Sequence, residues 1–392
     1  MYRVKIASRE QFEAFREEWN RLVLAMKRPS FFCSWEWIHT WWRHFDKQYD
    51  LRILLILEGE RLAGILPLAR TKFRPGMTMF PARILMLCGS RELYPDHMDF
   101  IGGEEGGIAA LTAGFDFLMR TQCDWDLIHL SHIGEDSLIM KYFENNPGQV
   151  KKASVSPFIA LNGGFDEFLR RFSRKHRYNL NRQQKKLYTE HGVVFSYGKE
   201  GSENGIVKDL TELFRLHKMR KDNVGIKSTF AAEKIAKFHI DLAKEIAPKG
   251  WLRISSLKKR DQVIAMDYGF SFGGSFNFYQ SGLDPDWENQ SVGATLLMET
   301  IREAVAEGLK EFDFLRGDEE YKRLWTKEGR ALFDILVPNK NLSGEILKSE
   351  MVVKNWVRRL FGKDSPDREA AKGGNGSGAS SAGACSSRPM IG

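Results

Sequence analysis

The sequence predicts an α/β protein built from two α/β domains in tandem, and three observations support this. The chain has 392 residues, which is too many for one ordinary domain and fits two. Hydrophobic residues make up 42% of it and aromatic residues 12%, enough to build folded cores. Segments with strand-like and helix-like hydrophobic patterns alternate along the chain, which is typical of α/β domains.

The two halves carry a weak internal repeat. Each half contains, in order, a strand hairpin with a charged turn, a further strand, a helix and another strand. The hairpin, helix and last strand lie at residues 51–70, 107–120 and 125–128 in the first half, and at 251–272, 294–307 and 312–315 in the second. We therefore expect an N-terminal domain at residues 1–160 and a C-terminal domain at 161–345.

Residues 165–190 lie between the repeats and are expected to form a basic helical insertion in the second domain. Its first turns carry an apolar stripe that begins at Phe165 and ends at Phe172. Residues 170–186 hold eight Lys or Arg and no Asp or Glu, which accounts for the whole net charge of +8. Such a helix indicates an anionic partner, which could be a phosphorylated ligand, RNA or an anionic membrane surface, or it is simply a solvated face.

Several features exclude other classes of protein. Residues 364–392 are rich in Gly and Ser and predict a disordered tail. No apolar run is long enough to span a membrane, and the N-terminus lacks the apolar segment of a signal peptide. The cysteines, Cys33, Cys88, Cys123 and Cys385, have no paired spacing, so we expect neither a disulfide framework nor a metal site. These observations predict a soluble, cytoplasmic protein and leave its oligomeric state open.

A turn of small residues opens the helix of the second repeat. Gln290, Gly293, Ala294 and Thr295 lie where a strand and a polar break lead into this helix. The first backbone N–H groups of a helix are unpaired and, with the helix dipole, attract phosphate oxygens. Gly293 would let the backbone approach a pyrophosphate closely.

The next strand, near residues 310–315, ends in a run of polar residues. Asp313 lies among apolar residues and is either a buried acid with a raised pKa or the ion-pair partner of Arg316. Arg316, Tyr321 and Lys322 follow at the C-terminal end of the strand, where α/β sheets usually bind ligands.

These stretches resemble the acetyl-CoA motif of the GNAT superfamily, and more narrowly the CelD-like acetyltransferases, a GNAT group associated with bacterial cellulose and exopolysaccharide synthesis. The pieces that carry the resemblance are residues 32–37, 41–42, 175–177, 216–217, 279–285 and 312–322. The sequence departs from the GNAT phosphate loop at Thr295, where a Gly or Ala is usual. The group is also similar to the FemABX transferases, which are built from two GNAT-like domains.

The resemblance implies two tandem GNAT-like domains with mixed sheets flanked by helices, and transfer of an acyl group from acetyl-CoA directly to an amine. Tyr321 would protonate the departing thiolate and Asp313 would act as a base. The turn at Gln290, Gly293, Ala294 and Thr295 would hold the CoA phosphates. The expected substrate-binding residues are Tyr279, Gln280, Arg316, Lys322 and Arg177.

Plainer interpretations remain open. Tyr321 could be a half-buried aromatic beside Trp325, and Arg316 and Lys322 could be ordinary surface charges. His176 and His217 on the central helices are more typical of structural histidines. The acceptor would be a small molecule or a saccharide, such as an amino sugar. The alternatives are a FemABX-like transferase that takes an aminoacyl group from tRNA, and a scaffold that kept the fold without the chemistry.

Overall fold

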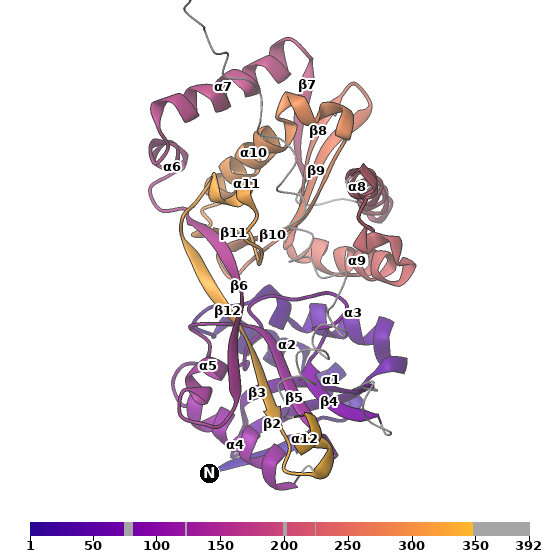
Figure 1. Ribbon diagram of the computed structural model, residues 1–392, viewed down its shortest axis with the longest axis vertical. Helices are drawn as coiled ribbons and strands as arrows, with labels where there is room; N and C mark the ends of the chain where they lie inside the picture. The colour runs from indigo at the N-terminus through magenta and orange to yellow at the C-terminus, as the bar shows by residue number, and fades with distance from the viewer. Residues whose placement is uncertain (74–80, 122–123, 199–201, 224, 348–392) are drawn as a thin grey trace, which may run out of the picture.

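A computed structural model describes residues 1–73, 81–121, 124–198, 202–223 and 225–347. The predicted tail at 364–392 lies outside the described residues, as do Cys123 and Cys385. Figure 1 shows two lobes joined by a pair of long strands. Among the described helices, none combines the length and the apolar character needed to cross a membrane.

A single 12-stranded sheet runs through both lobes in the order β1-β2-β3-β4-β5-β12-β6-β11-β10-β9-β8-β7. The strands are β1 (Tyr2–Ile6), β2 (Asp50–Glu58), β3 (Arg61–Phe73), β4 (Ala82–Leu87), β5 (Leu127–Gly134), β6 (Gln149–Ala160), β7 (Val193–Gly198), β8 (Leu252–Lys259), β9 (Gln262–Phe272), β10 (Ser275–Leu283), β11 (Glu311–Asp313) and β12 (Gly329–Pro338).

Helices cover both faces of this sheet. In the C-terminal lobe, α10 and the basic helix α7 lie on one side of the strands, and α8 and α9 lie on the other (Figure 1). The helices are α1 (Arg9–Ala14), α2 (Arg16–Leu24), α3 (Trp35–Phe45), α4 (Gly107–Thr121), α5 (Leu138–Phe143), α6 (Phe165–Arg170), α7 (Arg174–Thr189), α8 (Glu203–Asn223), α9 (Glu233–Ile246), α10 (Val292–Ala306), α11 (Glu320–Arg323) and α12 (Leu342–Leu347).

The internal repeat is real and longer than the sequence pattern suggested. We call β1–β5 with their helices the N-terminal repeat and β7–β11 with theirs the C-terminal repeat. In each repeat the first four strands are antiparallel neighbours, and the fifth pairs in parallel with the fourth. The crossover between the fourth and fifth strands contains α4 in one repeat and α10 in the other.

The two repeats exchange strands at the centre of the molecule. β12 follows the C-terminal repeat in sequence but pairs with β5 and with β6. β6 follows the N-terminal repeat, and its last residues pair with β11. Because each repeat is completed by a strand that follows the other, neither half of the chain contains its whole sheet.

Aromatic side chains near the N-terminus join the two lobes. Trp37 and Trp41 on α3 are buried, as their density in the sequence predicts for core residues. Phe31 stacks on Phe270 of the C-terminal sheet with 4.0 Å between the ring centroids. α3 also packs against α9 of the other lobe. The lobes therefore share one hydrophobic core.

The basic insertion is two helices rather than one. Ser173 caps the N-terminus of α7 by accepting a hydrogen bond from the His176 backbone N–H, and this separates α7 from α6. Phe168 anchors α6 in the core against Trp325. On α7, Leu180 and Leu187 are the buried residues, so its basic residues lie toward solvent.

Candidate active site

Two parallel strands separate in the middle of the C-terminal repeat. β10 and β11 pair over three residues each, Ser275–Asn277 of β10 with Glu311–Asp313 of β11. β11 then ends, whereas β10 continues to Leu283 beside β9. Beyond Asp313 the two strands therefore leave a gap in the sheet at their C-terminal ends, the position where α/β sheets bind ligands.

Asp313 itself ends the short strand. Its Oδ1 accepts a hydrogen bond from the Leu315 backbone N–H at 2.7 Å, and Leu315 has a φ of 56°. A carboxylate that captures a nearby backbone N–H competes with the sheet ladder and favours a turn. The left-handed conformation of a leucine is strained, and such strain concentrates at functional sites.

A cavity of about 560 Å³ occupies the gap between the strands. Its walls come from β10, the segment between β11 and α11, the C-terminal end of α8, and a loop of the N-terminal repeat that includes Glu92 and Asp96. Its size lies in the range of small-molecule and cofactor sites. The predicted residues Tyr279, Gln280, Arg316, Tyr321 and Lys322 all line it, so the structure brings these five together.

Tyr321 lies on α11 in the cavity wall. Burial raises the pKa of its phenol, and the nearby Glu319 raises it further. The hydroxyl therefore stays protonated at neutral pH, and its raised pKa makes it a weaker acid than a free phenol. Its ring also packs at the edge of the cluster that contains Trp325.

Asp313 is buried in a network of polar side chains and does not line the cavity. Its carboxylate accepts a hydrogen bond from Ser156 Oγ at 2.7 Å and pairs with His97 Nε2 at 3.0 Å and Arg330 at 3.5 Å. Burial would raise its pKa, but His97, Ser156 and Arg330 hold the pKa of this carboxyl well below its usual range. A carboxylate stabilised in this way is a weak base.

Lys322 is buried, the side chain of Arg316 is 7% exposed, and both are paired within the protein. The Arg316 backbone N–H and guanidinium both donate to Asp96, at 2.8 and 3.3 Å. Lys322 Nζ donates to the carbonyls of Leu315 and Arg316 and forms an ion pair with Glu319 at 2.8 Å. These two cations therefore hold the cavity wall in shape, and the Arg316 contact joins it to the N-terminal repeat.

Tyr279 stands at a β-bulge. The register between β10 and β9 shifts between Phe278 and Gln280, so Tyr279 has no partner residue in β9. Its hydroxyl donates to the Leu93 carbonyl at 3.1 Å. Arg177 lies elsewhere. Its guanidinium donates to the carbonyls of Arg170, the last residue of α6, and of Phe172, and Arg177 is absent from the cavity lining.

The predicted phosphate turn lies beyond one end of the cavity. A 3-10 turn, Pro285–Gln290, leads into α10, and Ser291 between them has a φ of 56°. The cavity lining reaches Glu288 and contains none of Gln290, Gly293, Ala294 and Thr295. Thr295 is 2% exposed, and a Cβ on Gly293 would lie 3.2 Å from Leu283. Lys186 of α7 donates to Gln290 Oε1 at 3.2 Å, which brings the basic helix to this turn.

Some cavity residues escaped the sequence analysis. Arg220 and Lys221 come from the end of α8, and Glu92 and Asp96 come from the loop after β4. His217 also lines the cavity; its Nδ1 hydrogen-bonds Ser228 Oγ at 2.8 Å. Burial, with Lys221 and Arg220, lowers the pKa of His217 to about 3. The internal repeat gave one signal that could have found Glu92 and Asp96. Their loop, after β4, has the same place in the N-terminal repeat as the predicted phosphate turn has in the C-terminal repeat.

No metal centre is evident in the part of the chain that the structure describes, since no three His, Cys, Asp or Glu side chains gather there as ligands.

Comparisons with known proteins agree with this architecture. The family model described as an acetyltransferase (GNAT) domain matches residues 174–323, which run from α7 to α11 and include the cavity. No curated protein matches the sequence. The crystal structure of FemX superposes with a TM-score of 0.62 at 10% identity, covering 88% of this chain and 99% of that one.

Two further structures are similar over most of their length. L-PGS from Bacillus licheniformis gives a TM-score of 0.56 at 12% identity, covering 92% of this chain and 98% of that one. A conserved protein of unknown function from Bacteroides thetaiotaomicron gives 0.54 at 10% identity, covering 87% and 100%. The chain thus has a GNAT-like α/β fold, with two tandem copies that share one mixed sheet flanked by helices.

Proposed function

We propose that the protein is an acyl-CoA-dependent N-acyltransferase whose donor binds in the cavity between β10 and β11. The observation that carries this proposal is the coincidence of three features: a gap between two parallel strands, a cavity in that gap, and a match to the acetyltransferase (GNAT) domain over the same residues. The acyl group would be acetyl, as the matched domain suggests.

The donor would lie along β10. Its thioester would be near the bulge at Tyr279, where an unpaired stretch of backbone can polarise the carbonyl. Its phosphates would be toward the start of α10, where the helix N-terminus and Lys186 provide positive potential. Arg220 and Lys221 supply further cations at the cavity wall.

Tyr321 is the proposed general acid. It lies in the cavity wall and its hydroxyl is protonated at neutral pH, so it carries a proton that the departing thiolate can take. Asp313 is a poor candidate for the base, because its carboxylate is enclosed by His97, Ser156 and Arg330.

We propose that the amine acceptor is an amino sugar, as the resemblance to the CelD-like acetyltransferases implies. This link to cellulose or exopolysaccharide synthesis rests on that resemblance alone.

A second candidate is a transferase that takes an aminoacyl group from tRNA. The structural similarity to FemX over 88% of this chain and the exposed cations of α7 favour it. Sensitivity of the activity to RNase, with no need for CoA, would support this candidate over the first.

A thermal-shift titration tests the donor. A ligand at one hundred times its Kd stabilises the native state by about 2.7 kcal/mol, so acetyl-CoA should raise the Tm by several degrees and ATP should not. No shift at millimolar acetyl-CoA would contradict the proposal and leave the tRNA-dependent transferase and a scaffold without chemistry as the candidates.

The chemical step has its own test. Tyr321→Phe should lower acetyl transfer about a hundredfold while the acetyl-CoA shift persists. Tyr178→Phe is the matched control, because Tyr178 is 65% exposed on α7 and absent from the cavity lining. Equal turnover in the two variants would remove Tyr321 from the mechanism.

A further inference from the structure

The loop after β4 is more than twice as long as its counterpart in the C-terminal repeat. It spans residues 88–106 between β4 and α4, whereas the connection between β10 and α10 spans 284–291. Part of this loop, from Glu92 to Asp96, forms a wall of the cavity in the other repeat. The N-terminal repeat therefore contributes side chains to the cavity between β10 and β11 of the C-terminal repeat.

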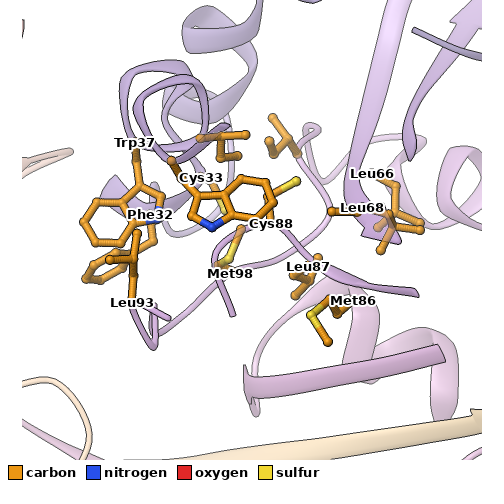
Figure 2. Packing of buried hydrophobic residues seen from close by; sticks show 14 of the residues in the cluster. Phe32, Cys33, Trp37, Leu66, Leu68, Met86, Leu87, Cys88, Leu93 and Met98 are labelled. Atoms are coloured by element: carbon orange, nitrogen blue, oxygen red, sulfur yellow. The ribbon is translucent and has the colours of Figure 1, made fainter. Parts of the chain in front are cut away.

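The loop is held firmly in that position. Leu93 and Met98 are buried, and Figure 2 shows Leu93 beside the rings of Phe32 and Trp37. The Leu93 carbonyl accepts the hydrogen bond from Tyr279 on β10. The neighbouring Glu92 is thus fixed relative to the strand along which the donor would lie.

Glu92 differs from the other carboxylate of this wall. Asp96 is neutralised by the backbone N–H and guanidinium of Arg316. Glu92 accepts hydrogen bonds from the Tyr49 hydroxyl and from Trp41 Nε1, and it takes part in no ion pair among the residues that the structure describes. Two neutral donors orient this carboxylate, and the charge of Arg91 acts on it without forming an ion pair.

The surroundings of Glu92 suit proton transfer. Burial raises the pKa of its carboxyl, although Tyr49, Trp41 and Arg91 act in the opposite sense. A half-buried carboxylate that forms no ion pair gains when a ligand brings a positive charge. The two histidines of the cavity wall, His217 and His239, both have a pKa lowered to about 3 and would be weak bases.

Successive residues of β10 contact different parts of the cavity wall, and this places the acceptor and the donor phosphates apart. Tyr279 touches Leu93 of the loop, Ser281 bonds Arg220 at 3.4 Å, and Leu283 approaches Gly293 at the start of α10. Tyr279 and Leu283 are about 13 Å apart, at roughly 3.3 Å per residue of strand. The loop and the phosphate turn therefore lie at opposite ends of the cavity.

We propose that Glu92 binds the primary ammonium group of the acceptor, so that the N-terminal repeat supplies the acceptor subsite to the donor cleft of the C-terminal repeat. This inference rests on the proposed function. Glu92 takes one proton from the ammonium group, and the freed amine attacks the thioester carbon. The C–N bond forms and the C–S bond breaks. Tyr321 gives its proton to the thiolate and recovers one from the nitrogen, which leaves an amide and a free thiol.

The test compares Glu92→Gln with Glu60→Gln, whose carboxylate lies exposed in the turn between β2 and β3. Gln carries no charge and has a single oxygen, which can accept from Trp41 Nε1 while its NH2 group donates to the Tyr49 hydroxyl. The probes are amines and their uncharged counterparts: glucosamine with glucose, cadaverine with 1,5-pentanediol, and ethanolamine with ethylene glycol. The readouts are release of CoA thiol from acetyl-CoA and the Tm shift with acetyl-CoA.

We expect at least one amine to support CoA release, and its uncharged counterpart to support none. In Glu92→Gln, kcat/KM for that amine should fall about a hundredfold while the acetyl-CoA shift is unchanged. Glu92→Asp should recover part of the loss, and Glu60→Gln should match the parent protein.

Two outcomes would overturn the assignment of Glu92 and leave the donor proposal standing: an acetyl-CoA shift with no amine accepted, or equal kcat/KM in the parent and Glu92→Gln. Absence of the acetyl-CoA shift in the parent protein would instead contradict the donor proposal.

Discussion

At the scale of single residues, the ion pair between His97 and Asp313 connects the two repeats. His97 follows β4, and Asp313 ends β11. Both side chains are nearly inaccessible to solvent, at 8% and 4% exposure. Removing one partner of a buried pair leaves the other uncompensated, which costs about 3–5 kcal/mol. We expect Asp313→Asn to lower the free energy of unfolding by this amount in urea titrations at pH 7. A loss below 1 kcal/mol would contradict this role.

The same pair makes stability depend on pH. Burial would lower the pKa of His97, but Asp313 and Asp96 raise it above 6.5 overall. The folded state therefore holds an extra proton between pH 6.5 and the raised pKa, and this stabilisation is lost as the pH rises through that pKa. Asp313 has a lowered pKa, so its contribution is lost only at strongly acidic pH. The decline of stability on the alkaline side should disappear in Asp313→Asn.

The sequence predicted some of the cavity residues but not the residues that they contact. It identified Tyr279, Gln280, Arg316, Tyr321 and Lys322, and the structure gathers all five at one cavity. It could not identify their partners, because Asp96 and Leu93 come from the other half of the chain. The catalytic and binding roles of these residues stay predictions.

At the scale of elements, α7 presents an exposed basic surface. We define the α7 surface as its exposed cations together with those just before it, namely Arg170, Arg171, Arg174, Lys175, Arg182, Lys185 and Lys186. None of them takes part in an ion pair with another described residue. Arg177 does not belong to this surface, because its guanidinium donates to the carbonyls of Arg170 and Phe172 at the end of α6 and just after it. Arg174 and Lys175 are therefore better sites for testing anion binding.

If the α7 surface binds RNA, Arg174→Glu with Lys175→Glu should weaken binding of bulk tRNA and reduce the slope of affinity against salt. The fold should tolerate the change, since exposed substitutions usually alter stability by less than about 0.5 kcal/mol. Filter binding across a range of salt measures both effects. Arg3→Glu with Lys47→Glu, which are exposed on the N-terminal repeat, is the control. An unaltered salt slope would leave α7 as a solvated face.

At the scale of the whole molecule, the sequence predicted the duplication but not the exchange of strands. Hairpins and helices produce local periodic patterns, so residues 51–70 and 251–272 could be matched by inspection. The partner of a strand is set by contacts far along the chain, and nothing local in β12 shows that it pairs with β5. The domain boundaries at 1–160 and 161–345 stay a prediction. The structure adds that β6 pairs with β11 of the C-terminal repeat and that β12 pairs with β5 of the N-terminal repeat.

This exchange makes a further prediction about folding. A chain ending at residue 160 would lack β12, which lies between β5 and β6. Both strands would then expose unpaired edges, and the Phe31 ring would lose Phe270. We expect fragment 1–160 alone to show no cooperative thermal transition by circular dichroism and to aggregate. Production together with 161–392 as a separate chain should restore a complex that melts cooperatively, as we also expect of the intact protein. A fragment 1–160 that unfolds cooperatively by itself would show that the N-terminal repeat is complete without the borrowed strand.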